Sequence, residues 1–334
     1  MAGLLWLGLL HYLMKTNSLH SVITHIKADK SWLITRGKGV HIAVIDTGIS
    51  DMSEFPIWKR SKYSWPSYDK AWSDNVGHGS MVGCIAAATM DIGGRYNGVA
   101  PDATLISCQT NFDEEQLCLI YEYLIGLVES KKIGRLVINN SYGVSKKEVA
   151  NQDFNAPFLK MVRSAVNKGI VVIFPAGNNH VLRCGNKTND CKNSIWGANS
   201  LDEIICVSTV DENNCLDRLP KKGYGFGHRD SSRGPGQFAR NSIKPDCVAP
   251  TYGEVLWGKY YEVKEWWGTS GAAAQVAGLS ALLLAKNPTL TPQQIQCIIK
   301  NSCTPLPYNA VSVGSGLVDC LTAVKLASNI AYKF

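Results

Sequence analysis

Hydrophobic residues fall into short blocks separated by longer segments of mixed polarity. The short blocks are rich in Val and Ile and do not alternate with polar residues, which is typical of strands buried on both faces. They cover residues 40–45, 105–108, 136–138, 170–174 and 204–207. The pattern therefore predicts five buried strands distributed over the first two thirds of the chain.

Segments with helical spacing lie between and after these blocks. Residues 114–130 carry apolar side chains at i, i+3 and i+4 intervals, namely Leu117, Ile120, Tyr121, Leu124 and Val128. Further helices are expected over 154–168, with Gly169 as C-cap, over 270–286, and over 291–301, which opens with Thr-Pro. Strands alternating with helices predict a three-layer α/β/α fold with a mainly parallel central sheet. In such folds the functional site lies at the carboxyl ends of the strands.

Composition and charge narrow the class of protein. The chain has 334 residues, of which 45% are hydrophobic, so a globular fold is expected. Its 34 Lys and Arg exceed its 27 Asp and Glu by 7, but the excess is spread along the chain, and nucleic-acid binding is not expected. No repeat or linker divides the sequence. We therefore expect one domain over 18–334, preceded by a hydrophobic segment at 1–17.

The N-terminal segment begins MAGLLWLGLLHYLMKT. Its apolar core is long enough for the h-region of a signal peptide, but too short for a conventional membrane-spanning helix. It has no basic n-region and no small-x-small cleavage site. A signal peptide, the remnant of a longer precursor and a docked helix all stay open. A secreted or extracytoplasmic location is weakly favoured over a cytoplasmic one, and the sequon at Asn186 would be usable only in a eukaryotic secretory pathway.

The eleven cysteines do not settle the redox compartment. Because their number is odd, at least one stays free or pairs between chains. Cys84, Cys108 and Cys206 lie in apolar runs, where a thiol behaves as a small hydrophobic group. Cys184 and Cys191 bracket a polar loop and have the spacing for a short disulfide. No CxxC pair occurs and no His has zinc-ligand spacing, so a structural zinc site is not expected.

Four polar residues stand where the predicted strands and helices begin or end. Asp46 follows the first strand, Asn178 follows the strand at 170–174, and His78 and Ser270 each open a small-residue helix. Taken alone, each has an ordinary structural explanation. Asp46 and Asn178 could be turn residues, His78 a surface or capping residue, and Ser270 a helix N-cap. Together they supply a carboxylate, an amide donor, a base and a nucleophile. Their joint occurrence, in the order Asp, His, Asn, Ser and each at the end of a strand or the start of a helix, is a much more specific signal than any one of them.

At these residues the chain resembles the subtilisin-like serine proteases, or subtilases, whose triad follows in the order Asp, His, Ser. Other segments similar to family motifs are Gly98-Val99-Ala100-Pro101, Val137-Ile138-Asn139-Asn140-Ser141, Ser231-Ser232-Arg233-Gly234-Pro235 and Lys244-Pro245-Asp246. The resemblance extends over roughly residues 20 to 325, and together its motifs are highly specific.

The resemblance implies a role for each of the four residues. Ser270 would attack the scissile carbonyl, His78 would take its proton, and Asp46 would orient the imidazole. The side-chain amide of Asn178 and the backbone N–H of Ser270 would bind the oxyanion. The expected activity is that of a serine endopeptidase acting through an acyl-enzyme.

The resemblance also implies how a protein or peptide substrate binds. Ser141, Tyr142 and Gly143 would pair with the extended substrate backbone beside the S1 pocket, which receives the side chain on the acyl side of the scissile bond. Ala176 and Gly177 would form part of the wall of that pocket. The residues around Asn111 would supply the opposite strand of the cleft.

Several positions depart from the family pattern. Gly271 and Ala274 replace a Met or bulkier residue and a Pro, Ser80 replaces Thr, and Met81 replaces a second His. Trp266 and Trp267, just before Ser270, either wall the cleft or pack in the interior.

The calcium-binding loops of secreted members are not matched, and the loop at 91–97 is short. We therefore expect no metal and no other cofactor. No inhibitory propeptide of the usual length precedes Asp46, so the chain is expected to be a mature fragment or a member that folds without one. A peptide-binding pseudoprotease, a transpeptidase and a subunit of a larger assembly stay open as alternatives.

Overall fold

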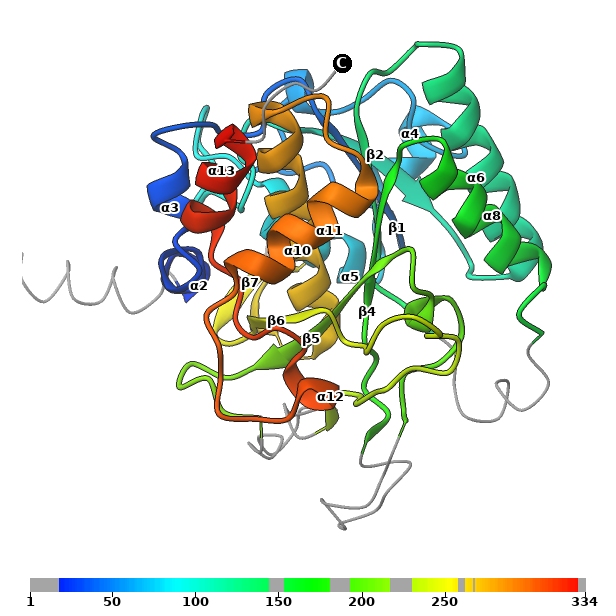
Figure 1. The fold of residues 1–334 in the computed structure, drawn as a ribbon. Coiled ribbons are helices and arrows are strands. Elements are labelled where there is room, and N and C mark those ends of the chain that lie inside the picture. The colour runs from blue at the N-terminus through cyan, green and yellow to red at the C-terminus, as the bar shows by residue number, and fades with distance from the viewer. Residues whose placement is uncertain are drawn as a thin grey trace, which may run out of the picture.

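The computed structural model describes residues 18–143, 153–180, 193–216, 230–257, 262–266 and 268–329. A six-stranded sheet forms its centre, in the order β2-β1-β3-β4-β5-β6, and all five neighbouring pairs are parallel (Figure 1). Its strands are β1 (His41–Asp46), β2 (Thr104–Gln109), β3 (Leu136–Asn140), β4 (Val171–Pro175), β5 (Ile205–Val210) and β6 (Cys247–Pro250). A separate antiparallel hairpin consists of β7 (Glu254–Trp257) and β8 (Glu262–Glu265).

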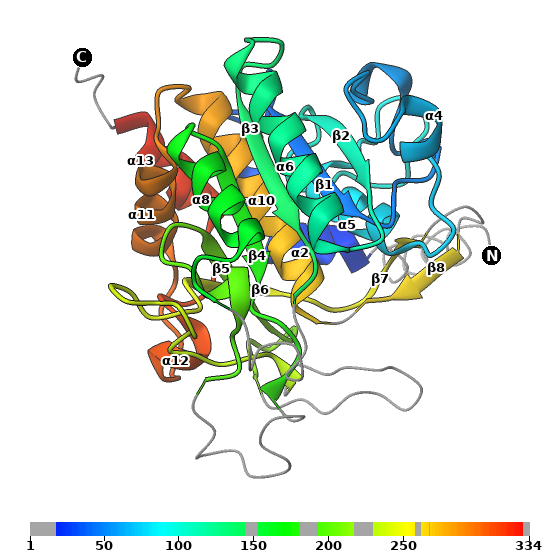
Figure 2. The same cartoon turned by 90° about the vertical axis from the view of Figure 1, so that its right-hand side faces the viewer.

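Helices cover both faces of the central sheet. In Figure 2, α6 (Glu114–Glu129) and α8 (Pro157–Asn167) lie side by side over one face, with α10 (Thr269–Lys286) behind it. The face of α10 also carries α2 (Ser18–His25), α3 (Ala28–Ser31), α5 (His78–Ala87), α11 (Pro292–Ser302) and α13 (Cys320–Asn329). Shorter elements are η1 (Ile57–Lys59), α4 (Tyr68–Ala71), η2 (Gly197–Ser200) and α12 (Ala310–Val313). The expected three-layer α/β/α fold is confirmed.

The two faces of one strand show why these segments are uniformly apolar. Ile42 and Val44 of β1 belong to the core shared with α5 and α10, whereas Ala43 and Ile45 belong to the core shared with α6 and α8. Because successive side chains of a strand point to opposite faces, a strand covered on both sides has no solvent-facing positions. The five predicted strands are therefore confirmed, with their ends shifted by a few residues at most.

The helix predictions also hold, with one change. The second helix begins at Pro157 instead of residue 154, because Pro157 lacks the amide hydrogen that an interior helical position needs and is tolerated in the first turn. Gly169 follows this helix at φ +82, a conformation that glycine adopts without strain. Thr291 forms a capping box with Gln294 at the start of α11. Strand β6, the β7–β8 hairpin and helix α13 were not predicted.

The described cysteines are free thiols. None of the nine that fall within the described ranges forms a disulfide, and Cys84, Cys108 and Cys206 are fully buried, as expected for small apolar groups. Cys184, Cys191 and Asn186 lie outside the described residues, as does the segment 1–17. Within the part of the chain that is described, no helix has both the length and the hydrophobicity needed to cross a bilayer.

Candidate active site

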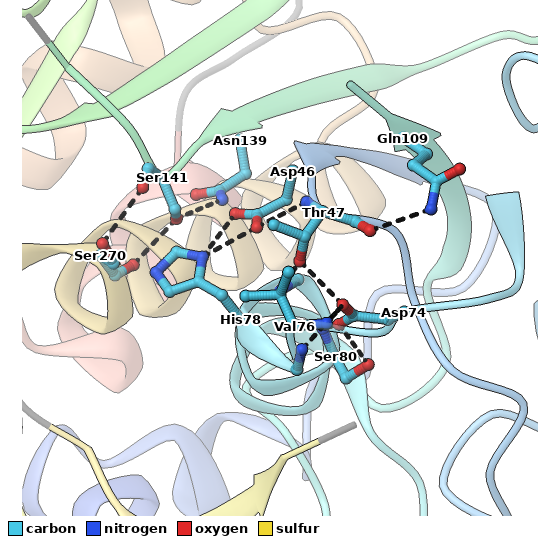
Figure 3. A network of polar contacts seen from close by, with 12 residues as sticks. Asp46, Thr47, Asp74, Val76, His78, Ser80, Gln109, Asn139, Ser141 and Ser270 are labelled. Atoms are coloured by element: carbon cyan, nitrogen blue, oxygen red, sulfur yellow. Dashed lines mark hydrogen bonds and ion pairs between the residues drawn. The ribbon is translucent and has the colours of Figure 1, made fainter. Parts of the chain in front are cut away.

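The polar residues predicted for the site lie at the carboxyl edge of the sheet. Asp46 is the last residue of β1, Ser141 follows β3, and Asn178 follows β4. His78 is the first residue of α5, and Ser270 lies in the first turn of α10. Figure 3 shows Asp46, His78, Ser141 and Ser270 grouped together, although they come from four separate parts of the chain.

The carboxylate of Asp46 orients the imidazole of His78. The Nδ1 atom of His78 lies 2.8 Å from Oδ1 and 3.0 Å from Oδ2 of Asp46. Asp46 is completely buried, and its Oδ1 also accepts the backbone N–H of Thr47 at 2.8 Å. Because the carboxylate can only accept hydrogen bonds, it selects the His78 tautomer that carries its hydrogen on Nδ1. The other ring nitrogen is then available as a proton acceptor.

The electrostatic surroundings favour the charged form of His78. Burial by itself lowers the pKa of the imidazole. The charge of Asp46, its hydrogen bond to the ring and the charge of Asp74 together outweigh that effect, so the pKa of His78 lies above its usual value of 6.5. An imidazolium formed here during a reaction would therefore be stabilised.

Asp74 is a second buried carboxylate beside the start of α5, with an exposed fraction of 2%. Its Oδ1 accepts the N–H of Gly77 at 2.8 Å and the hydroxyl of Thr47 at 2.9 Å. Its Oδ2 accepts the N–H of Ser80 at 2.9 Å and the Ser80 hydroxyl at 2.7 Å. These bonds satisfy free amides of the first helical turn. Asp74 thereby ties the helix that carries His78 to the turn after β1 (Figure 3).

The hydroxyl of Ser270 donates to the carbonyl oxygen of Ser141 at 3.1 Å, and the hydroxyl of Ser141 donates back to the carbonyl oxygen of Ser270 at 3.1 Å. Asn139 Nδ2 donates to the Ser141 hydroxyl at 2.8 Å. The ring nitrogen of His78 that is not bonded to Asp46 faces the Ser270 side in Figure 3. Because a hydroxyl has a single hydrogen, Ser270 Oγ must give up its bond to Ser141 before it can donate to this nitrogen.

Asn178 is oriented by the residue before Ser270. Its Oδ1 accepts both the backbone N–H and the hydroxyl of Thr269, each at 3.1 Å. The Nδ2 amide is thus the end of the side chain that can donate to a ligand. Gly268, at φ +91, makes room for it, since an added Cβ would lie 3.1 Å from both side-chain end atoms of Asn178.

The expected substrate-binding residues belong to the two chain segments that follow β3 and β4. Ser141 and Ala176 are buried, Tyr142 and Gly177 are half-buried, and Gly143 is exposed. Asn111 lies in the exposed segment between β2 and α6, and the expectation that the residues around it supply the opposite strand of the cleft stays a prediction. The Nδ2 of Asn111 donates to Asp113, two residues later.

Two tryptophans lie near the site. Trp266 is fully buried, which confirms the interior packing alternative for this residue, whereas Trp267 lies outside the described residues. Trp257, at the end of β7, presents its ring to His78 in an edge-on contact with 6.1 Å between centroids. Trp257 and Asp74 have no conspicuous signal in the sequence, because an aromatic strand residue and an acid before a helix are both common. Within the described ranges, no cluster of three or more His, Cys, Asp and Glu side chains could hold a metal ion.

Comparison with known proteins identifies the family. The profile of the subtilase family, Peptidase_S8, matches residues 37–317. The chain belongs to the subtilase family of serine proteases.

This subtilase is 28% identical over 298 residues to alkaline elastase YaB of Bacillus sp. (strain YaB), a match covering 86% of this chain and 65% of that protein. It is 26% identical to serine protease AprX of Bacillus subtilis (strain 168), covering 79% and 61% of the two chains. Subtilisin BL of Lederbergia lenta is 28% identical, with coverages of 86% and 92%. The chain thus spans less than two thirds of the length of the first two relatives.

Solved structures show the same fold. MycP1 with its N-terminal propeptide removed has a TM-score of 0.64 at 20% identity, covering 91% of this chain and 96% of that one. The S41 psychrophilic protease has a TM-score of 0.67 at 20% identity, with coverages of 85% and 92%.

Proposed function

We propose that the protein is a serine endopeptidase that cleaves peptide bonds through an acyl-enzyme, with Ser270, His78 and Asp46 as its triad. The observation that carries the proposal is the Asp46–His78 hydrogen bond, with the free side of the imidazole turned toward the first turn of α10. A carboxylate, an imidazole and a hydroxyl in this order are the groups needed to activate a serine nucleophile.

In the first half of the reaction, His78 removes the proton of Ser270 Oγ as this oxygen bonds to the scissile carbonyl carbon. Asp46 stabilises the resulting imidazolium. The oxyanion is held by Asn178 Nδ2 and the backbone N–H of Ser270. Collapse of the tetrahedral intermediate breaks the C–N bond, and His78 returns the proton to the leaving amine.

In the second half, His78 removes a proton from water as the water oxygen attacks the acyl carbon. The bond between the acyl carbon and Ser270 Oγ then breaks, His78 gives its proton to Ser270 Oγ, and the acid product leaves. The hydrogen bond from Ser270 to the Ser141 carbonyl belongs to the resting state, and it must break before attack.

The substrate is proposed to be a protein or peptide bound in extended form. Ser141, Tyr142 and Gly143 continue from the end of β3 and present backbone groups beside the nucleophile, which supports pairing with a substrate strand. We also propose a secreted or extracytoplasmic location, supported by the signal-like apolar segment at 1–17. Cell fractionation would test the location.

Labelling with a fluorophosphonate probe tests the catalytic assignment. Wild-type protein should be labelled and should cleave a peptide library, and Ser270→Ala should lose both properties while melting at the same temperature. Ser328→Ala, an exposed serine of α13, provides the matched control and should keep both. An unlabelled but folded wild type would contradict the proposal in favour of a peptide-binding pseudoprotease. Ligated products formed with an added amine would indicate a transpeptidase.

A further inference from the structure

A buried asparagine joins the two chain segments that flank the proposed S1 pocket. Asn199, in η2, is 3% exposed. Its Nδ2 donates to the carbonyl oxygen of Tyr142 at 3.1 Å and to the carbonyl oxygen of Pro175 at 2.7 Å. Tyr142 belongs to the segment after β3, and Pro175 is the last residue of β4. Both amide hydrogens of Asn199 are thus used to bridge the walls.

The bridge fills the space beside Gly143. A Cβ added to Gly143 would lie 2.8 Å from Asn199 Nδ2, so a side chain there would force the Asn199 amide to shift from its position in the bridge. The η2 turn is itself fixed, because Gly197 N–H donates to Gln237 at 3.0 Å and the Ser200 hydroxyl donates to the Gly197 carbonyl at 2.7 Å. Asn199 is therefore held in place by its own turn as well as by the two walls.

Asn199 also lines a large cavity, together with residues of the first wall. The cavity has a volume of about 850 Å³, and its lining includes Tyr142, Gly143, Asn199 and the apolar rings of Phe158 and Phe174. Among the described residues, the second wall (Ala176 and Gly177) and the nucleophile Ser270 do not line it. Asn199 thus borders the cavity and is also bonded to the end of β4, the strand that leads to Asn178.

We propose that Asn199 determines substrate specificity by closing the bottom of the S1 pocket, so that the enzyme cleaves after small residues such as Gly, Ala and Ser. The inference rests on the proposed endopeptidase function. A side chain on the acyl side of the scissile bond enters between the two walls. The bridge stops it from reaching the cavity behind. Without the bridge, the pocket opens into this cavity, where the rings of Phe158 and Phe174 are available to contact a large side chain.

The test compares peptide substrates that differ only at the P1 residue, Ala against Phe. Wild type should have the higher kcat/KM for Ala, and Asn199→Gly should raise the Phe-to-Ala ratio about 10- to 100-fold. Asn287→Gly is the matched control, because Asn287 is also buried and donates to a backbone carbonyl, that of Ala327. It follows the last residue of α10, about 25 Å along this helix from Ser270. The control should leave the ratio unchanged.

The fluorophosphonate probe separates failure of this inference from failure of the proposed function. A labelled wild type that prefers Phe at P1 would overturn the specificity assignment and leave the triad intact. A labelled Asn199→Gly with an unchanged ratio would also overturn it. If Asn199→Gly does not fold, Asn199→Ala, which also removes the bridging amide, should show the same direction of change. An unlabelled wild type contradicts the endopeptidase itself.

Discussion

The indole of Trp266 lies directly against Gly271, the residue after Ser270. A Cβ on Gly271 would lie 1.9 Å from Cζ3 and 2.2 Å from Cε3 of the ring, and 3.2 Å from Cδ1 of Ile85. The family usually has a larger residue at the position of Gly271. The glycine at position 271 and the buried Trp266 are complementary, because the tryptophan ring occupies the volume that a larger side chain at position 271 would need.

Gly271→Ala should therefore destabilise the protein by about 1–3 kcal/mol, since the added methyl overlaps a ring that is closely packed. It should also lower activity, because the strain arises beside Ser270. Gly126→Ala is the control: Gly126 lies on the exposed face of α6 with nothing within 4 Å of an added Cβ, and this change should be neutral or stabilising. Thermal melts of the two variants measure the effect on stability, and kcat measures the effect on activity. Equal stabilities of the two variants would contradict the packing argument.

The hydrogen bonds of Asn178 predict graded effects on kcat. Asn178→Ala should reduce kcat by about 10²–10³, the known magnitude for loss of one oxyanion donor. Thr269→Val removes the hydroxyl that donates to Asn178 and accepts the N–H of Gly177, but keeps the backbone N–H bond to Asn178, so a loss of about tenfold is expected. KM should change little in both, because the oxyanion forms only in the transition state. A larger loss for Thr269→Val than for Asn178→Ala would contradict this assignment.

The raised pKa of His78 predicts where activity falls in acid. His78 must be neutral to accept the Ser270 proton, so kcat/KM should decline as the pH drops through the pKa of the free enzyme. Because the pKa lies above the usual 6.5, the midpoint of the decline should also lie above pH 6.5. A pH profile of kcat/KM with a midpoint below 6 would show that the imidazole is not stabilised in this way.

Asp74→Asn tests whether Asp74 acts on His78 through its charge. Removal of the negative charge makes the imidazolium less favourable, so the midpoint should move to lower pH. Stability should fall by about 1–3 kcal/mol, because one carbonyl oxygen cannot replace all the bonds of the carboxylate. Asp102→Asn, which removes a carboxylate paired with Arg36, is the control and should leave the midpoint unchanged. A loss of stability in Asp74→Asn with no shift in midpoint would indicate a purely structural role.

A metal chelator should change neither the melting temperature nor the rate of this protein. A bound metal stabilises the folded state by mass action, and this stabilisation disappears when the metal is removed. The loop at 91–97 does not match the calcium loops of secreted members. Thermal melts with and without EDTA provide the measurement. A large decrease in melting temperature that is restored by added calcium would refute the expectation.

The regular elements were predicted well because their signal is local. Strand and helix periodicity determine which side chains are buried, and buried positions are apolar. This is why the apolar block before Asp46 and the helical spacing of Leu117, Ile120 and Tyr121 could be recognised in the sequence. Strand β6 and the β7–β8 hairpin are short, and their apolar runs are interrupted by Pro and charged residues. Strand β6 depends on pairing with β5, which lies far from it in the sequence. The strands of the hairpin are close in sequence, but β7 packs against the distant helix α5, so in both cases the strand's own residues carry little signal.

The sequence by itself determined the three-layer fold and the family, since both follow from periodicity and from motifs whose residues are adjacent along the chain. Only the tertiary structure decided that Ser270 is bonded to Ser141 at rest, that Asp74 is tied to Thr47, and that Asn199 bridges Tyr142 and Pro175. Asn199 and Tyr142 are 57 positions apart. Contacts of this kind depend on how whole elements pack and on which rotamers the packing allows, and neither is encoded in a local pattern.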